Sequence, residues 1–117
     1  MRTEDLKVYQ AAEALVAEVD GILQRLPYRL RRTADHLDRS ANSVLNNVSE
    51  GAAIFSPKGK ANAYAVARKE AQEVKAALRA TVLRKGIDQQ AIAKAYHLAD
   101  CIIAMLTRMI KNLETRY

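Results

Sequence analysis

Residues that could bind a metal ion are few, and their spacing does not fit a metal site. Di-iron sites in helical bundles need Glu-x-x-His motifs on two helices and further Glu residues on the helices that face them. The sequence has two histidines, His36 and His97, and the residues three positions before them are Thr33 and Lys94. We therefore predict no metal site.

Signals of nucleophilic catalysis or phosphate binding are equally weak. Cys101 lies between Asp100 and Ile102, with no adjacent cation to favour a thiolate, so we interpret it as a small hydrophobic residue. The segment "FSPKGKAN" lacks the spacing of a phosphate-binding loop. Glu70 and Glu73 share one helical flank, which is typical of ordinary ion pairing. The sequence thus predicts no catalytic residue, no cofactor and no small-molecule substrate, and we expect a protein that is not an enzyme.

A row of cations gives the strongest binding signal in the chain. Arg68, Gln72, Lys75 and Arg79 are spaced at i, i+4, i+7 and i+11, which places them on one helical line about 16 Å long. Lys69 lies further round the same helix, and these five residues are called the basic stripe below. Such a line can follow a phosphate backbone or an acidic protein surface. The simpler alternative is a solvated face.

Charge is distributed unevenly along the chain. Residues 57–85 contain eight basic and two acidic residues, whereas residues 3–26 contain two basic and five acidic residues. This separation leaves two functions open. The basic stripe could bind RNA, DNA or a ribonucleoprotein, with little sequence preference because it has no aromatic residue to stack on bases. Alternatively, the chain is a purely protein–protein assembly module in which the cations contact a partner or the acidic segment of a neighbouring subunit. The formal net charge of +6 favours nucleic acid.

Four amphipathic segments must position these residues. Apolar residues recur at three- and four-residue spacing over residues 4–26, 28–50, 57–85 and 88–115. Thr3 and Ser56 are predicted N-caps, and Gly51 is predicted to end the second helix in a left-handed C-cap. Short connections between long helices predict a single all-α domain, residues 1–117, folded as an antiparallel up-down-up-down four-helix bundle with left-handed crossings.

The first and last helices carry more apolar residues than one core line needs. On the first, the predicted core line is Leu6, Tyr9, Ala12, Val16, Val19, Leu23 and Leu26. Second lines repeat every seven residues, and they consist of Val8, Leu15 and Ile22 on the first helix and Tyr96, Ile103, Ile110 and Tyr117 on the last. Either the core face is wide, or these second lines form a subunit interface. Because large exposed apolar patches are unusual in monomers, we expect a homo-oligomer.

The second helix ends in an unusual run, "NNVSEG", residues 46–51. A helical wheel places Ser43 and Asn47 on a polar line beside the apolar one, which indicates a tight contact with another helix. Glu50 faces the negative end of the helix dipole, so we expect a cation near it. The candidates for that cation are Lys58, Lys60 and Lys111. We interpret this run as a structural clamp.

Cysteine content and hydropathy indicate the cellular compartment of the protein. A single cysteine excludes an internal disulfide framework. No segment approaches 18 uncharged apolar residues, and the first ten residues, "MRTEDLKVYQ", contain no apolar signal core. We therefore expect a cytoplasmic protein with no membrane partner.

Three segments in order resemble a known bacterial family. "EDLKVYQAAEAL" resembles an Asp-Leu-x-Val-Trp-Gln-Lys-Ala opening, with Tyr9 in place of Trp. "RSANSVLNNVSEG" is similar to Arg-Ala-x-x-Ser-Ile-x-x-Asn-Ile-Ala-Glu-Gly, and "ARKEAQEVKAAL" occupies the place of a Gly-Ser-Leu-x-Glu-Leu-Glu-x-x-Leu segment. The family is that of the four-helix-bundle proteins encoded in intervening sequences of ribosomal RNA genes.

The resemblance implies a left-handed bundle, a ring-like homopentamer and no established enzymatic activity. It also implies relatives among the accessory proteins of diversity-generating retroelements, which bind a reverse transcriptase and nucleic acid. The motif residues carried over by the resemblance are Ser43, Asn47, Glu50, Gly51 and Glu73.

Overall fold

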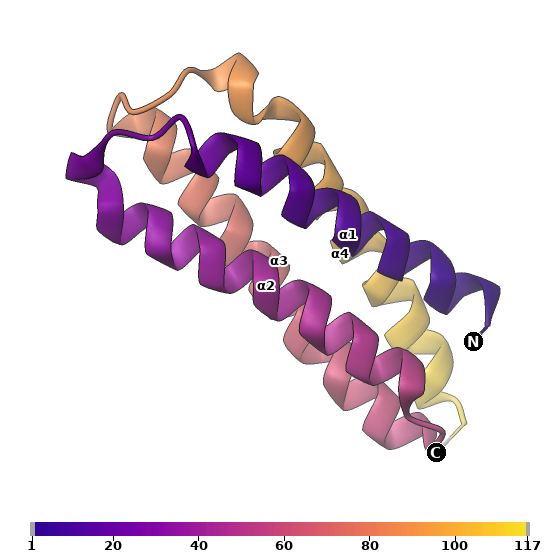
Figure 1. The fold of residues 1–117 in the computed structure, drawn as a ribbon. Coiled ribbons are helices and arrows are strands. Elements are labelled where there is room, and N and C mark those ends of the chain that lie inside the picture. Colours follow the sequence, from indigo (N-terminus) through magenta and orange to yellow (C-terminus); the bar gives the residue numbers. More distant parts are fainter. Residues whose placement is uncertain (1, 117) are drawn as a thin grey trace.

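The computed structural model describes residues 2–116, and these form four long α-helices (Figure 1). The helices are α1 (Thr3–Leu23), α2 (Arg31–Ala53), α3 (Pro57–Leu83) and α4 (Gln89–Glu114), and a short 3-10 helix, η1 (Tyr28–Leu30), precedes α2. No strand occurs in this part of the chain. The Cα atoms fill a rod of 46 × 21 × 19 Å. The predicted all-α four-helix fold is confirmed.

The helices follow one another along the rod in alternating directions (Figure 1). Contacts between α3 and α4 run in opposite order along the two helices, because Arg68 bonds to Thr107 whereas Lys75 bonds to Asp100. α2 and α3 form the most extensive pair, and α1 packs against α2 and α4. The left-handed twist stays a prediction.

The core line of α1 differs from the expected one. Val8, Leu15 and Ile22, which were assigned to a possible interface, are at most 4% exposed, whereas Leu6 is 44% exposed. Both lines have helical spacing, so spacing alone could not choose between them. Asp5 is also buried on the core side of α1, where it meets polar partners, and this fixes the rotation of the helix. For α1, the wide-core alternative is therefore correct.

The second apolar line of α4 has a mixed outcome. Ile110 is buried and belongs to the core, so its expected place in an interface was wrong. Tyr96 and Ile103 are partly buried and pack against the core. Tyr117 lies outside the described residues. Among the described residues of this line, only Tyr96 and Ile103 keep surface that a partner could cover.

The helix ends confirm some of the predicted caps and correct others. Ser56 caps α3 by accepting a hydrogen bond from the Gly59 amide at 3.2 Å, as expected. Thr3 is not a cap, because α1 begins at Thr3 itself and Arg2 precedes it without a side-chain bond. Gly51 is not left-handed, because α2 continues through it to Ala53. The backbone adopts a positive φ, 59°, at Lys85, two residues after the end of α3.

No helix in residues 2–116 combines the length and the hydropathy that crossing a bilayer requires.

Candidate functional site

A buried polar cluster joins the beginnings of α1 and α3 to the last turns of α2. The Lys60 ammonium donates to the Gly51 carbonyl at 2.7 Å and lies 3.3 Å from Oδ2 of Asp5. The Tyr64 hydroxyl donates to Oδ1 of Asp5. All four residues are buried, and Asp5 is only 1% exposed. A buried cation with a carboxylate and a carbonyl partner is a satisfied arrangement, and we call these four residues the motif clamp.

Gly51 is needed in the motif clamp because Tyr64 lies directly against its backbone. A Cβ atom at Gly51 would lie 2.4 Å from Cε1 and 2.6 Å from Cδ1 of the Tyr64 ring. The ring also carries the Lys60 ammonium 5.3 Å from its centroid. The role of Gly51 is therefore to allow close helix packing, and not to supply a left-handed turn.

Lys60, one of the cations expected near Glu50, binds the carbonyl of Gly51 instead. Glu50 is exposed and forms no ion pair within residues 2–116. Lys60 contacts the Gly51 carbonyl, one of the last carbonyls of α2 that lack a helical donor. A cation on these carbonyls also offsets the negative end of the helix dipole. Of the residues assigned to a structural clamp, Gly51 belongs to this cluster with Lys60, Asp5 and Tyr64, and the predicted pairing of Glu50 with a cation is wrong.

The pKa of Tyr64 provides a test of the motif clamp. Burial, followed by the hydrogen bond to Asp5, raises this pKa well above its ordinary value. The folded chain therefore keeps a proton on Tyr64 that the unfolded chain loses near pH 10. The contribution of this group to the free energy of unfolding is fully present below about pH 10 and declines as the pH rises further. Above about pH 10 we expect this contribution to lower the free energy of unfolding by about 1.4 kcal/mol per pH unit, and Tyr64→Phe should abolish the contribution. Urea unfolding at alkaline pH measures it.

Tyr28→Phe is the matched control, because Tyr28 is 79% exposed. This control should retain the alkaline decline of the unaltered chain. Equal declines in the unaltered chain, Tyr64→Phe and Tyr28→Phe would contradict the assignment to Tyr64.

A polar groove between α2 and α3 brings together residues of the second and third motifs. Nε2 of His36 lies 3.6 Å from Oε2 of Glu73, and both side chains are nearly half exposed. Asn47 donates to the carbonyl of Ser43 at 2.8 Å and to its hydroxyl at 3.1 Å, so these two bond within α2. Lys69 lines this groove together with Ser43 and Glu73. Among the described residues that line this groove, only His36 and Glu73 form an ion pair, and Lys69 has no carboxylate partner.

Three residues of the basic stripe bond to side chains of α4. The Lys75 ammonium is 2.6 Å from Asp100, and this hydrogen bond raises the pKa of Lys75. Arg68 donates to the Thr107 hydroxyl at 3.4 Å, and Arg79 donates to Oε1 of Gln89 at 2.7 Å. Gln72 is exposed. Lys75 is therefore neutralised by its neighbour, whereas the partners of Arg68 and Arg79 are uncharged.

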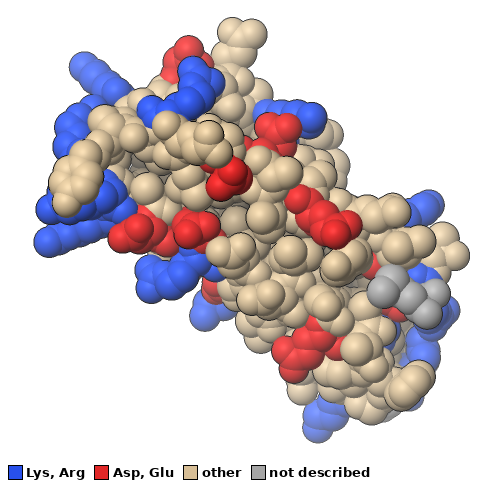
Figure 2. Space-filling model, viewed as in Figure 1, with Lys and Arg blue, Asp and Glu red and all other residues tan. Residues whose placement is uncertain are grey.

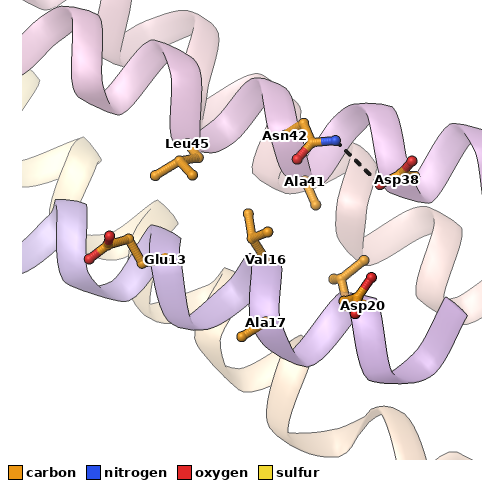
Figure 3. Close-up of a pocket in the computed structure, with 9 residues that line it drawn as sticks. Glu13, Val16, Ala17, Asp20, Asp38, Ala41, Asn42 and Leu45 are labelled. Atoms are coloured by element: carbon orange, nitrogen blue, oxygen red, sulfur yellow. Dashed lines mark hydrogen bonds between the residues drawn. The ribbon is translucent and has the colours of Figure 1, made fainter. Parts of the chain in front are cut away.

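A groove with an acidic rim lies between α1 and α2 (Figure 3). It encloses about 450 Å³. Its rim holds Glu13 and Asp20 from α1 and Asp38 from α2, and Val16 and Leu45 lie between them (Figure 3). Sequence reasoning found the acidic first helix but missed the contribution of Asp38, because only folding brings α2 beside α1.

The fold and these sites define a small helical bundle with a buried polar clamp and separate charged surfaces. Its sequence matches the model of the 23S rRNA-intervening sequence protein family over residues 4–108, and it belongs to that family. This range contains all three motif segments, so the family resemblance is confirmed. No curated protein matches the chain.

Proposed function

We propose that the chain is a non-enzymatic, oligomeric adaptor that binds nucleic acid or a ribonucleoprotein through the outer face of α3. The observation that supports this proposal is the uncompensated charge on that face. Arg68 and Arg79 have only neutral hydrogen-bond partners, and Lys69 is exposed. Cations of this kind can exchange their counterions for phosphates, which makes binding strong at low salt and insensitive to sequence.

The basic stripe is tested by neutralising the three cations that lack a carboxylate partner. The variant Arg68→Gln/Lys69→Gln/Arg79→Gln leaves the Lys75–Asp100 pair intact. In fluorescence anisotropy with a labelled single-stranded RNA, we expect weaker binding. The slope of log K against log salt should also become shallower by about 2, since each phosphate contact to a single strand contributes about 0.7.

The control for this experiment is Lys7→Gln/Lys58→Gln/Lys94→Gln. It removes the same charge from exposed positions outside the basic stripe. This control should retain most of the slope of log K against log salt that the unaltered chain shows. Equal losses in the two triple variants would show that only net charge matters, and would contradict binding through α3.

The acidic groove favours a second candidate function, in which the chain is purely an assembly module. Its rim of Glu13, Asp20 and Asp38 complements the basic stripe of another copy. Contacts between two different surfaces of one chain build rings when the rotation closes, as in the homopentamer that the family resemblance implies. The same basic-stripe variant would then lower the mass measured by light scattering and leave RNA affinity unchanged.

A further inference from the structure

Arginines gather at the end of the bundle where α2 begins and α3 ends. A pocket of about 290 Å³ at this end is lined by Arg29, Arg31, Arg32 and Arg84, together with Leu30 and Thr33. Figure 2 shows Lys and Arg side chains crowded over the same end, at the left of the view. None of these four arginines forms an ion pair with a carboxylate in the described part of the chain. Such a concentration of unpaired cations attracts a polyanion.

The pocket forms where the connection between α1 and α2 contacts the connection between α3 and α4. Nη2 of Arg29 donates to the carbonyls of Arg84 and Lys85, at 2.9 and 3.3 Å. Gly86 lies against Leu30, because a Cβ atom at Gly86 would lie only 2.2 Å from Cδ1 of Leu30. Arg29 therefore has a positioning role, and it fixes the other arginines of the pocket near one another.

Tyr28 adds an aromatic surface beside the arginines. Its side chain is 79% exposed, and the Arg31 guanidinium lies 4.7 Å from the ring centroid. This cation–π contact holds the ring against Arg31, which lines the pocket. Unpaired bases stack on exposed aromatic side chains. A ring beside several arginines therefore matches a single strand, which offers both bases and phosphates.

We propose that Tyr28, Arg31, Arg32 and Arg84 form a binding site for single-stranded nucleic acid. The arginines hold successive phosphates, and Tyr28 stacks on one unpaired base. The ligand class is that of the proposed function, on which this inference rests, but the site lies at the end of the bundle and not on the basic stripe. RNA and DNA single strands share the required chemistry, so both are used in the test.

The test measures anisotropy of labelled RNA and DNA strands of the same sequence with the full chain. Tyr28→Ala should weaken binding of either strand at least about fivefold, and Tyr28→Phe should retain it, because phenylalanine still stacks. Phe55→Ala is the control, since Phe55 is fully exposed in the connection at the opposite end of α2. On an abasic strand of equal charge, Tyr28→Ala should bind like the unaltered chain.

Neutralising Arg31, Arg32 and Arg84 to glutamine should weaken binding to both the normal and the abasic strand, while Arg29 is left in place. Equal binding by Tyr28→Ala and Phe55→Ala would overturn the proposal, as would equally strong competition by poly-glutamate, which would indicate an acidic protein partner. If only the basic-stripe variant loses binding, this site is wrong and the proposed function stands. If only the Tyr28 and arginine variants lose it, the site stands and α3 is not the binding surface. Failure of the unaltered chain to bind any strand would overturn both.

Discussion

Replacing Asp5 by alanine should lower the free energy of unfolding by about 3–5 kcal/mol. The change leaves the Lys60 ammonium buried without a carboxylate, with the Gly51 carbonyl as its hydrogen-bond partner, and it leaves the Tyr64 hydroxyl without its acceptor. An uncompensated buried charge costs far more than a lost surface contact. Urea unfolding followed by circular dichroism at neutral pH gives the difference directly.

Glu4→Ala is the matched control for Asp5→Ala. Glu4 precedes Asp5 in the same helical turn, but its pair with Arg2, at 3.6 Å, is between side chains that are 42% and 59% exposed. This control should cost no more than about 1 kcal/mol. Adding Lys60→Met to Asp5→Ala should recover part of the loss, because the unpaired charge is then gone. A cost for Asp5→Ala no larger than that of Glu4→Ala would contradict the motif clamp.

Replacing Gly51 by alanine should destabilise the chain by about 1–3 kcal/mol. The new methyl group would overlap the Tyr64 ring, and that ring is held by its bond to Asp5 and cannot easily move. The sign is informative, because a glycine-to-alanine change within a helix ordinarily stabilises by about 0.5–1 kcal/mol. Thermal and urea unfolding of the variant measure it.

Gly21→Ala provides the opposite case on the same fold. Gly21 lies within α1, and a Cβ atom there would meet nothing within 4 Å. This variant should gain the ordinary helical stabilisation of about 0.5–1 kcal/mol. If Gly51→Ala were stabilised to the same extent, the close approach of Tyr64 to α2 would be refuted.

The class of fold followed from the sequence because helical periodicity and short connections are local properties. The choice between the two apolar lines of α1 did not follow, since Val8, Leu15 and Ile22 have the same spacing as the line predicted to be core. Packing decided it, together with the buried partners of Asp5.

The motif clamp was only partly predictable. The unusual run at residues 46–51 indicated a committed helix end, but the partners of that end lie far away in the chain. Asp5 had the appearance of an ordinary acidic residue in a first helical turn, and Lys60 that of one more surface lysine. One signal was available, namely that Asp5 and Gly51 belong to the first and second family motifs, so a shared contact between these motifs could have been anticipated.

The buried residues of the motif clamp and the cations without carboxylate partners therefore have different roles. The motif residues Asp5 and Gly51 are buried and hold three helices together. The cations without carboxylate partners lie outside that clamp, on α3 and at the end of the bundle. This division assigns stability to the motifs and places the proposed nucleic-acid binding on the outer charges.

The most direct measurement is the salt dependence of binding of single-stranded RNA by the unaltered chain between about 50 and 200 mM salt. The proposed function predicts binding at low salt, with log K falling linearly as log salt rises, and a slope that becomes shallower by about 2 when Arg68, Lys69 and Arg79 are neutralised. No detectable binding at the lowest salt concentration, or a slope that this triple variant leaves unchanged, would contradict it.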